Sequence, residues 1–120
     1  MGIFNKNYGH TKYANLEEVE GDKTRVVQLY TEVLKIPEKN IKILDDASYD
    51  DLDDLWSYLK ALYRDASKPG QDTIFMLWFA GHGEMGGSAL TQVCTNTQDP
   101  DKRLFPWEAR LNVLIEMHSK

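Results

Sequence analysis

An α/β fold with a mostly parallel sheet is the fold class that this 120-residue sequence predicts. Short apolar runs with strand character alternate with segments whose apolar residues recur at helical spacing. Strand and helix in alternation are typical of parallel strands joined by crossover helices. The length fits one domain around one hydrophobic core, so residues 1–120 are interpreted as a single domain.

The first half of the chain predicts strand, helix and strand. Residues 2–4 are a short apolar strand ending, and residues 40–44 alternate in polarity and favour a second short strand. Between them, a helix is expected from Asp22 up to Pro37, because proline cannot continue a helix. Its apolar residues at helical spacing are Val26, Tyr30, Val33 and Leu34.

The second half opens with the clearest helix signal. Ser48 can cap this helix, and Asp51 three residues later completes a capping-box pattern. Residues 67–70, Ser-Lys-Pro-Gly, end it, and the apolar run 73–79 is long enough for a buried strand. The apolar face of the helix consists of Leu52, Leu55, Trp56, Leu59, Leu62 and Tyr63.

The remaining elements are a short strand, a polar turn and a last helix. The strand is expected over residues 89–95 after a Gly86-Gly87 turn, the polar turn over 96–103, and the helix from Pro106 onward. All three tryptophans fall on an apolar face or strand and are expected in the core: Trp56, Trp78 and Trp107.

Composition excludes several classes of partner. The formal net charge of −5 disfavours nucleic acid and anionic membrane surfaces. No stretch has the apolar length of a membrane helix, and the N-terminus lacks a signal-peptide pattern. Cys94 is the only cysteine, so no internal disulfide is possible and a cytoplasmic location is expected.

His82 is the candidate catalytic residue. It stands between Gly81 and Gly83, directly after the apolar run 73–79. Active sites of open α/β sheets gather at the carboxyl ends of the strands, which favours a functional histidine here. The alternative is a histidine that merely ends a strand with its hydrogen bonds satisfied. No Gly-x-Ser-x-Gly motif occurs, which excludes a lipase-like α/β-hydrolase.

The segment Asp72-Thr-Ile-Phe-Met-Leu-Trp-Phe-Ala-Gly-His-Gly83 resembles the catalytic-histidine segment of caspase-like cysteine peptidases, which include caspases, metacaspases and paracaspases. In that family an acidic residue precedes an apolar strand that ends in Ser-Gly-His-Gly or Ala-Gly-His-Gly. Residues 4–8, 21–22 and 36–44 are similar to the family's first strand ending, first helix start and second strand. The resemblance implies a caspase-like three-layer fold with a mostly parallel sheet.

The resemblance also implies roles for two residues. His82 would be the general base of a Cys/His dyad that hydrolyses peptide bonds, and the Gly83 backbone N–H would lie near the oxyanion. Aspartate-specific members of the family use an arginine just before the first helix. Residues 14–20 contain none, which favours the metacaspase-like side.

The nucleophile of the family is missing from this sequence. The caspase cysteine follows its histidine by roughly 50 residues. Here Cys94 alone follows His82, 12 positions later, in a segment where the family has a small surface hairpin. Cys94 is interpreted as a small structural hydrophobe. The chain is therefore expected to be the histidine-bearing part of a domain truncated at both ends, and inactive by itself.

Two function hypotheses remain open. In the first, the chain is completed by a cysteine-bearing segment or chain and acts on peptide or protein substrates. In the second, it is a caspase-like module without activity that serves binding or assembly. A sheet that stops here exposes an edge, so self-association or docking of another chain is expected there.

No metal site or other cofactor is predicted. Some metacaspases require calcium, and six aspartates cluster around the second helix start, but their spacing lacks an EF-hand pattern. Acidic residues in a first helical turn are instead stabilised by the helix dipole. His10, His82 and His118 are too scattered to predict a zinc site. The aspartates are Asp45, Asp46, Asp50, Asp51, Asp53 and Asp54.

Overall fold

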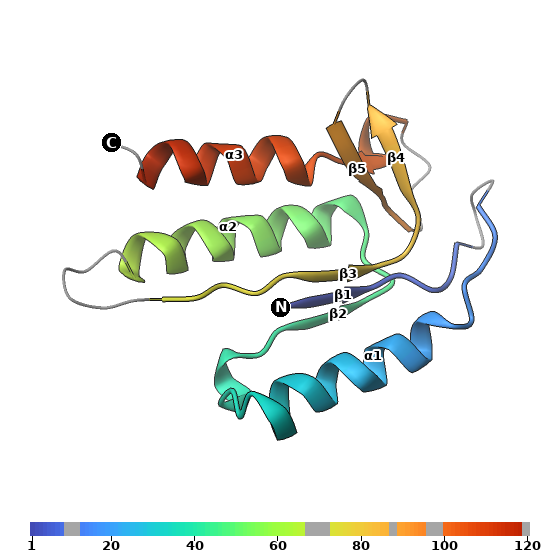
Figure 1. Ribbon diagram of the computed structural model, residues 1–120. Coiled ribbons are helices and arrows are strands. Elements are labelled where there is room, and N and C mark those ends of the chain that lie inside the picture. Colours follow the sequence, from blue (N-terminus) through green and yellow to red (C-terminus); the bar gives the residue numbers. More distant parts are fainter. Residues whose placement is uncertain (9–12, 67–72, 87–88, 96–99, 119–120) are drawn as a thin grey trace.

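The chain folds as a mixed α/β structure, with a small parallel sheet and a small antiparallel sheet (Figure 1). The computed structural model describes residues 1–8, 13–66, 73–86, 89–95 and 100–118. Its elements are β1 (Gly2–Phe4), α1 (Val19–Gln28), the π-helical turn η1 (Leu29–Val33), the 3₁₀ turn η2 (Glu38–Asn40), β2 (Ile43–Asp45), α2 (Tyr49–Ala66), β3 (Trp78–Ala80), β4 (Gly83–Gly86), β5 (Ala89–Val93), the 3₁₀ turn η3 (Pro100–Lys102), β6 (Leu104–Phe105) and α3 (Trp107–His118).

The parallel sheet has the strand order β2-β1-β3. Gly2 is aligned with Ile43 on one side and with Trp78 on the other, and both pairings are parallel. The parallel sheet predicted from the sequence is confirmed for these three strands. The second sheet, β4-β5-β6, is antiparallel and follows β3 directly in the chain.

Helices lie on both faces of the parallel sheet, with α1 on one side and α2 and α3 on the other (Figure 1). Successive side chains of a strand point to opposite faces, and β1 supplies both hydrophobic clusters for that reason. Ile3 belongs to a cluster with residues of α2 and α3, including Leu52. Phe4 belongs to a cluster with Val26 of α1 and Tyr30. The sheet is thus covered on both faces.

Helix α2 begins as the sequence predicts. The Ser48 N–H donates to Asp51 Oδ2 at 2.9 Å, and the Asp51 N–H donates to Ser48 Oγ at 3.2 Å, which is a reciprocal capping box. Helix α1 begins at Val19, three residues before the expected Asp22, and its last turn is the π-helical η1. Among the described residues, no helix combines the length and apolarity that crossing a membrane requires.

The apolar run 73–79 differs from the prediction of a buried strand. Only Trp78–Ala80 pairs as β3, and residues 73–77 precede it without strand structure. Ile74 is 85% exposed and Trp78 is 47% exposed. These side chains are exposed because β3 is at an edge of the described sheet. The expectation that Trp78 lies in the core was therefore wrong, whereas Trp56 and Trp107 are buried as predicted.

The fourth predicted strand and the last helix lie close to their expected positions. Strand β5 ends at Val93, two residues short of the expected 95, and it forms a hairpin with β4. Helix α3 begins at Trp107, directly after Pro106. The expected turn 96–103 is described only from residue 100 onward, and the expected Gly86-Gly87 turn includes Gly87, which lies outside the described residues.

Asn5 is a buried polar residue that joins four segments at the end of β1. Its Oδ1 accepts the Ala47 N–H at 2.8 Å, and its Nδ2 donates to the Val93 oxygen at 3.4 Å. Its own backbone N–H donates to the Ala80 oxygen at 2.9 Å. The β2–α2 turn, β5 and β3 are thereby held against the end of β1.

Replacing Asn5 by alanine is expected to destabilise the fold by about 2–4 kcal/mol, because it leaves a buried N–H and a buried carbonyl without their partner. The measurement is the free energy of unfolding from urea titration. Asn7→Ala is the matched control, since the Asn7 side chain donates to Asp46 in an exposed setting, and about 0.5 kcal/mol is expected. Equal losses in both variants would contradict this role of Asn5.

Candidate functional site

His82 lies directly beyond the carboxyl end of β3, in the two-residue link to β4. The end of β1 and the segment before α1 reach the same end of the sheet, because parallel strands share their carboxyl edge. The sequence-based placement of His82 at a strand end is confirmed. Asp72, the acidic residue of the resemblance, lies outside the described residues.

The imidazole of His82 is oriented by a backbone carbonyl. Its Nε2 lies 2.8 Å from the Ala14 oxygen. A carbonyl oxygen can only accept a hydrogen bond, so this geometry requires the proton on Nε2. In the neutral imidazole, Nδ1 then carries the free lone pair. The arrangement selects one tautomer, in which Nδ1 is able to take a proton.

Two tyrosines pack against the His82 ring. The ring centroids of Tyr8 and His82 are 4.7 Å apart in an edge-on arrangement, and those of Tyr13 and His82 are 5.2 Å apart. The Tyr8 hydroxyl also accepts the His82 backbone N–H at 2.9 Å. Burial raises the pKa of Tyr8, which keeps this hydroxyl protonated near neutral pH. The ring and backbone of His82 are both held by its neighbours.

Gly81 permits this close packing. A Cβ atom at this position would lie 2.6 Å from the Tyr8 hydroxyl and 2.8 Å from the ring of Phe79. Any other residue would therefore displace the tyrosine that holds His82. The glycine before the histidine is explained by close approach of side chains to the backbone.

Gly83 is exposed at the start of β4. The Val93 N–H donates to the His82 oxygen at 3.0 Å, whereas the His82 N–H donates to the Tyr8 hydroxyl, so one hydrogen bond joins His82 and Val93 at a bonded position of the ladder. Residues alternate between bonded and non-bonded pairs along an antiparallel ladder, so Gly83 and Gln92 form a non-bonded pair. The Gly83 N–H is consequently directed away from β5.

A polar cluster that the sequence analysis missed adjoins the histidine. It consists of Tyr13, Glu84 and Arg103. Arg103 Nη1 lies 2.6 Å from Glu84 Oε2 and 3.0 Å from the Tyr13 hydroxyl, and that hydroxyl donates to the same Glu84 oxygen. The three residues are far apart in the sequence and belong to no recognisable motif, so no sequence signal identified them.

Asp46 holds the segment that follows β1. Its Oδ1 accepts the backbone N–H groups of Lys6 and Asn7, each at 2.9 Å. Burial acts to raise the pKa of Asp46, but these N–H donors and the Asn7 amide lower it on balance, so the carboxylate stays charged. The path of the chain toward Tyr8 is set by these bonds.

Cys94 is fully buried and belongs to the core cluster that contains Ile3 and Leu52. Burial raises the pKa of its thiol to about 12. A thiolate is the nucleophilic form of cysteine, and this environment suppresses it. The burial agrees with the interpretation of Cys94 as a structural residue.

The aspartates near α2 are engaged individually rather than around a common centre. Asp45 pairs with Lys23 at 2.8 Å, and Asp53 pairs with Arg110 at 2.5 Å. Asp51 caps the helix. Within the described part of the chain, no group of three or more His, Cys, Asp or Glu residues converges as metal ligands would. His10, one of the three histidines, lies outside that part.

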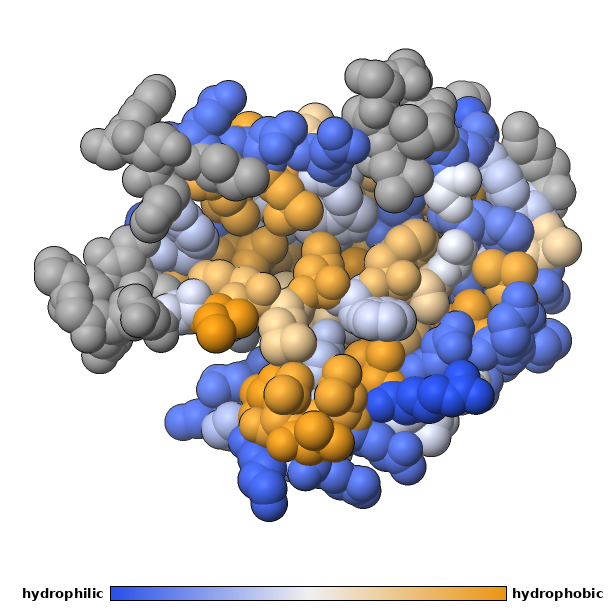
Figure 2. Space-filling view, viewed as in Figure 1, coloured by the Kyte–Doolittle hydropathy of each residue, from blue (hydrophilic) through white to orange (hydrophobic). Residues whose placement is uncertain are grey.

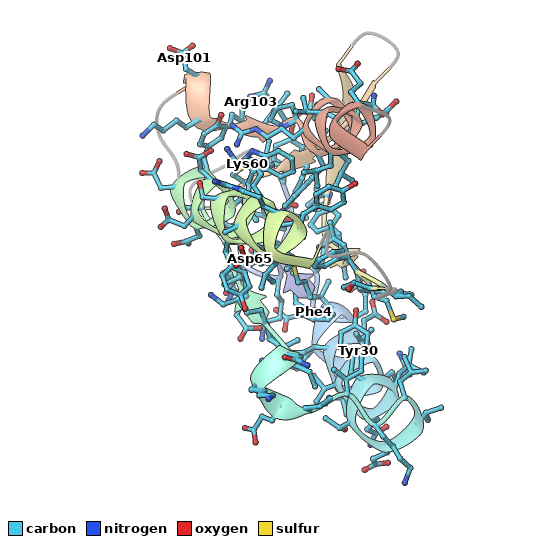
Figure 3. All side chains as sticks on the ribbon, turned by 90° about the vertical axis from the view of Figure 1, so that its left-hand side faces the viewer. Phe4, Tyr30, Lys60, Asp65, Asp101 and Arg103 are labelled. Carbon is cyan, nitrogen blue, oxygen red and sulfur yellow. The ribbon has the colours of Figure 1, made fainter. Side chains whose placement is uncertain are left out.

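A cavity lies at the opposite end of the sheet from His82. It is a mainly apolar cavity of about 450 Å³ between η1, the segment before β2, α2 and the exposed run 73–76. Figure 3 faces this end and labels Tyr30 of η1, one of the lining residues. Its lining side chains include Tyr30, Leu34, Ile36, Ile41, Lys42, Tyr58, Leu62, Ile74, Phe75 and Met76.

Comparison with known proteins found no matching protein-family model, no matching curated protein and no matching solved structure. The interpretation of the site therefore rests on the local sequence pattern and on the geometry around His82.

Cys94 is expected to resist alkylation in the folded protein. With a thiol pKa of about 12, roughly one molecule in ten thousand is ionised at pH 8, and burial also blocks access. Iodoacetamide labelling followed by mass spectrometry should proceed at least about a thousandfold more slowly than with a free thiol, and normally in urea. Fast labelling of the native protein would identify Cys94 as a reactive thiol.

Proposed function

We propose that this chain is the histidine-bearing portion of a caspase-like cysteine endopeptidase, with His82 as the general base. The observation that carries the proposal is the 2.8 Å contact between His82 Nε2 and the Ala14 oxygen. A base in a nucleophile–base pair needs a third group that orients it, and a backbone carbonyl can do so. The tautomer selected here leaves Nδ1 available to a thiol.

The proposed reaction proceeds by acyl transfer. His82 Nδ1 takes the proton from the thiol, and the thiolate attacks the carbonyl carbon of the scissile peptide bond. The Gly83 N–H donates to the oxyanion that forms. The imidazolium then returns the proton to the leaving amine. Water, deprotonated by the same Nδ1, hydrolyses the thioester and releases the thiol.

The layered arrangement supports the proposed caspase-like fold. Helices cover both faces of a parallel sheet, and the histidine follows the last strand of its described part (Figure 1). In open α/β sheets, the carboxyl edge is the place for chemistry. These features fit the three-layer fold that the sequence resemblance implies.

The nucleophile is proposed to come from a cysteine-bearing segment or chain outside residues 1–120. Cys94 is the only cysteine of the sequence and is buried in the core. A cysteine-bearing strand added beside β3 would bring its carboxyl end next to His82, because parallel neighbours end at the same edge. Peptides or proteins would be the substrate. A cytoplasmic setting would keep such a thiol reduced.

The first test examines His82 and activity together. The chain, His82→Ala and Cys94→Ala are assayed on fluorogenic peptides with arginine, lysine or aspartate before the scissile bond, with and without calcium. No turnover is expected in any of them, because the nucleophile is absent. In parallel, the ¹⁵N chemical shifts of the neutral wild-type His82 ring are expected to show a protonated Nε2 and an unprotonated Nδ1.

Two outcomes would contradict the proposal. Turnover that disappears in both His82→Ala and Cys94→Ala would make Cys94 the nucleophile and would overturn its structural assignment. A ring protonated at Nδ1 would remove the base from the proposed mechanism.

A non-catalytic interaction module is the second candidate function, and the apolar edge beside β3 favours it. Ile74, Phe75, Met76 and Trp78 are all at least 38% exposed. Figure 2 shows apolar surface gathered across the middle of this face, bordered by polar surface. A run that is apolar on both faces is typical of an interior strand, and an open edge offers its backbone groups to another strand. We propose that a second copy of the chain pairs there.

Self-association through this edge is expected to be concentration-dependent. Ile74→Lys places a charge in the apolar surface, so its dimerisation constant should weaken by roughly tenfold or more, which is on the order of 1.4 kcal/mol. Sedimentation equilibrium measures the constant. Gln28→Lys, at an exposed position of α1, makes the same charge change elsewhere and should have no effect. A wild-type chain that stays monomeric at high concentration would contradict this pairing.

A further inference from the structure

The carbonyl that orients His82 comes from a loop and not from the sheet. Ala14 lies in the segment between β1 and α1, where it is exposed. Its oxygen can stay 2.8 Å from His82 Nε2 only while this segment is held in place. This segment is held on the far side of Ala14 by Asn15, whose Oδ1 accepts the Tyr8 N–H at 2.7 Å, and on the near side by the contacts of Tyr13.

Tyr13 is held by an ion pair that reaches it from two other segments. Glu84 belongs to β4, and Arg103 lies between η3 and β6. Arg103 Nη1 donates to Glu84 Oε2 at 2.6 Å and to the Tyr13 hydroxyl at 3.0 Å, and the Tyr13 hydroxyl donates to the same carboxylate oxygen. Each of the three groups contacts the other two.

The Glu84–Arg103 ion pair is partly buried, and the backbones of both residues are paired with neighbouring segments. The side chains of Arg103 and Glu84 are 39% and 31% exposed, so the pair is less screened than a fully solvated one. The Arg103 backbone oxygen accepts the N–H of buried Cys94 at 2.8 Å. Glu84 is paired with Thr91 of β5 in the ladder. The cluster thus connects the Tyr13 segment to the antiparallel sheet.

Tyr13 also contacts the histidine directly. Its ring centroid is 5.2 Å from that of His82, with an interplanar angle of 37°. The hydroxyl at one end of Tyr13 is fixed by the ion pair, and the ring lies against His82. The backbone of the next residue carries the oxygen that His82 Nε2 contacts.

We propose that Tyr13 is a positioning residue for His82, locked by the Glu84–Arg103 ion pair. This inference rests on the proposed role of His82 as a base. Tyr13 keeps the Ala14 carbonyl on Nε2 and limits rotation of the imidazole, so that Nδ1 is presented in one direction. In this role Tyr13 acts through the histidine.

The test is the exchange of the His82 Nε2 proton with water, measured by NMR on the full chain. In the wild type, the hydrogen bond to Ala14 should slow this exchange enough for the proton to be observed. Tyr13→Phe keeps the ring but removes the hydroxyl, and Glu84→Gln removes the charge that holds it. Both are expected to accelerate exchange on the order of tenfold or more, the size expected for losing one charge-assisted hydrogen bond.

Tyr58→Phe is the matched control, because Tyr58 lies on α2 at the opposite end of the sheet, among the residues of the apolar cavity. It should leave the exchange rate unchanged. Circular dichroism and urea midpoints show whether each variant stays folded. A purely structural role of Tyr13 would shift the midpoint without changing exchange at His82.

The outcomes separate this inference from the proposed function. If wild-type Nε2 carries a protected proton but Tyr13→Phe and Glu84→Gln leave its exchange unchanged, Tyr13 is not the positioning residue and the role of His82 stands. If the wild-type ring is protonated at Nδ1, His82 does not have the proposed role as a base, and both the proposed function and the role of Tyr13 are contradicted. Faster exchange in both variants and not in Tyr58→Phe supports the inference.

Discussion

The central position of β1 in the parallel sheet is the constraint on which the rest of the structure depends. Its three residues pair with β2 and β3 at once, so the ends of all three strands meet. Directly after β1, Asn5 binds the backbones of Ala47 and Val93, and Asp46 binds those of Lys6 and Asn7. Asn5 is buried and Asp46 is partly buried, and polar groups that are hydrogen-bonded to the backbone in this way favour one arrangement of the chain.

The candidate site is a consequence of that arrangement. The chain after β1 supplies Tyr8 and the Tyr13–Ala14 segment, whereas the chain after β3 supplies His82. His82 is thus oriented by residues of the loop that follows β1. Tyr8 of this loop leaves no room for a side chain at position 81, which explains why a glycine precedes the histidine. A base whose ring is already held by packed rings and backbone hydrogen bonds loses little rotational freedom in the reaction. This is the advantage of a preorganised site.

The same constraint leaves β3 at the sheet edge. Apolar side chains on both faces of residues 74–79 suit an interior strand, yet among the described strands only β1 pairs with β3. The proposed cysteine-bearing strand and the proposed second copy would occupy this one edge. Both proposals therefore follow from one physical feature, namely apolar surface and backbone groups that face water.

The sequence by itself determined the local features. Strand and helix alternation, the capping box of Ser48 and Asp51, and the place of His82 after an apolar run were predicted from it, because they depend on spacing along the chain. The burial of Trp56 and Trp107 followed from helical periodicity in the same way.

Only the tertiary structure decided what lies beside these elements. Periodicity describes which residues are apolar and not which neighbours cover them, so the exposure of Ile74 and Trp78 was missed. The group that orients His82 is a backbone oxygen, which every residue carries and no sequence pattern marks. Tyr13, Glu84 and Arg103 meet only because the loop before α1, strand β4 and the residue before β6 converge, and that convergence depends on long-range packing.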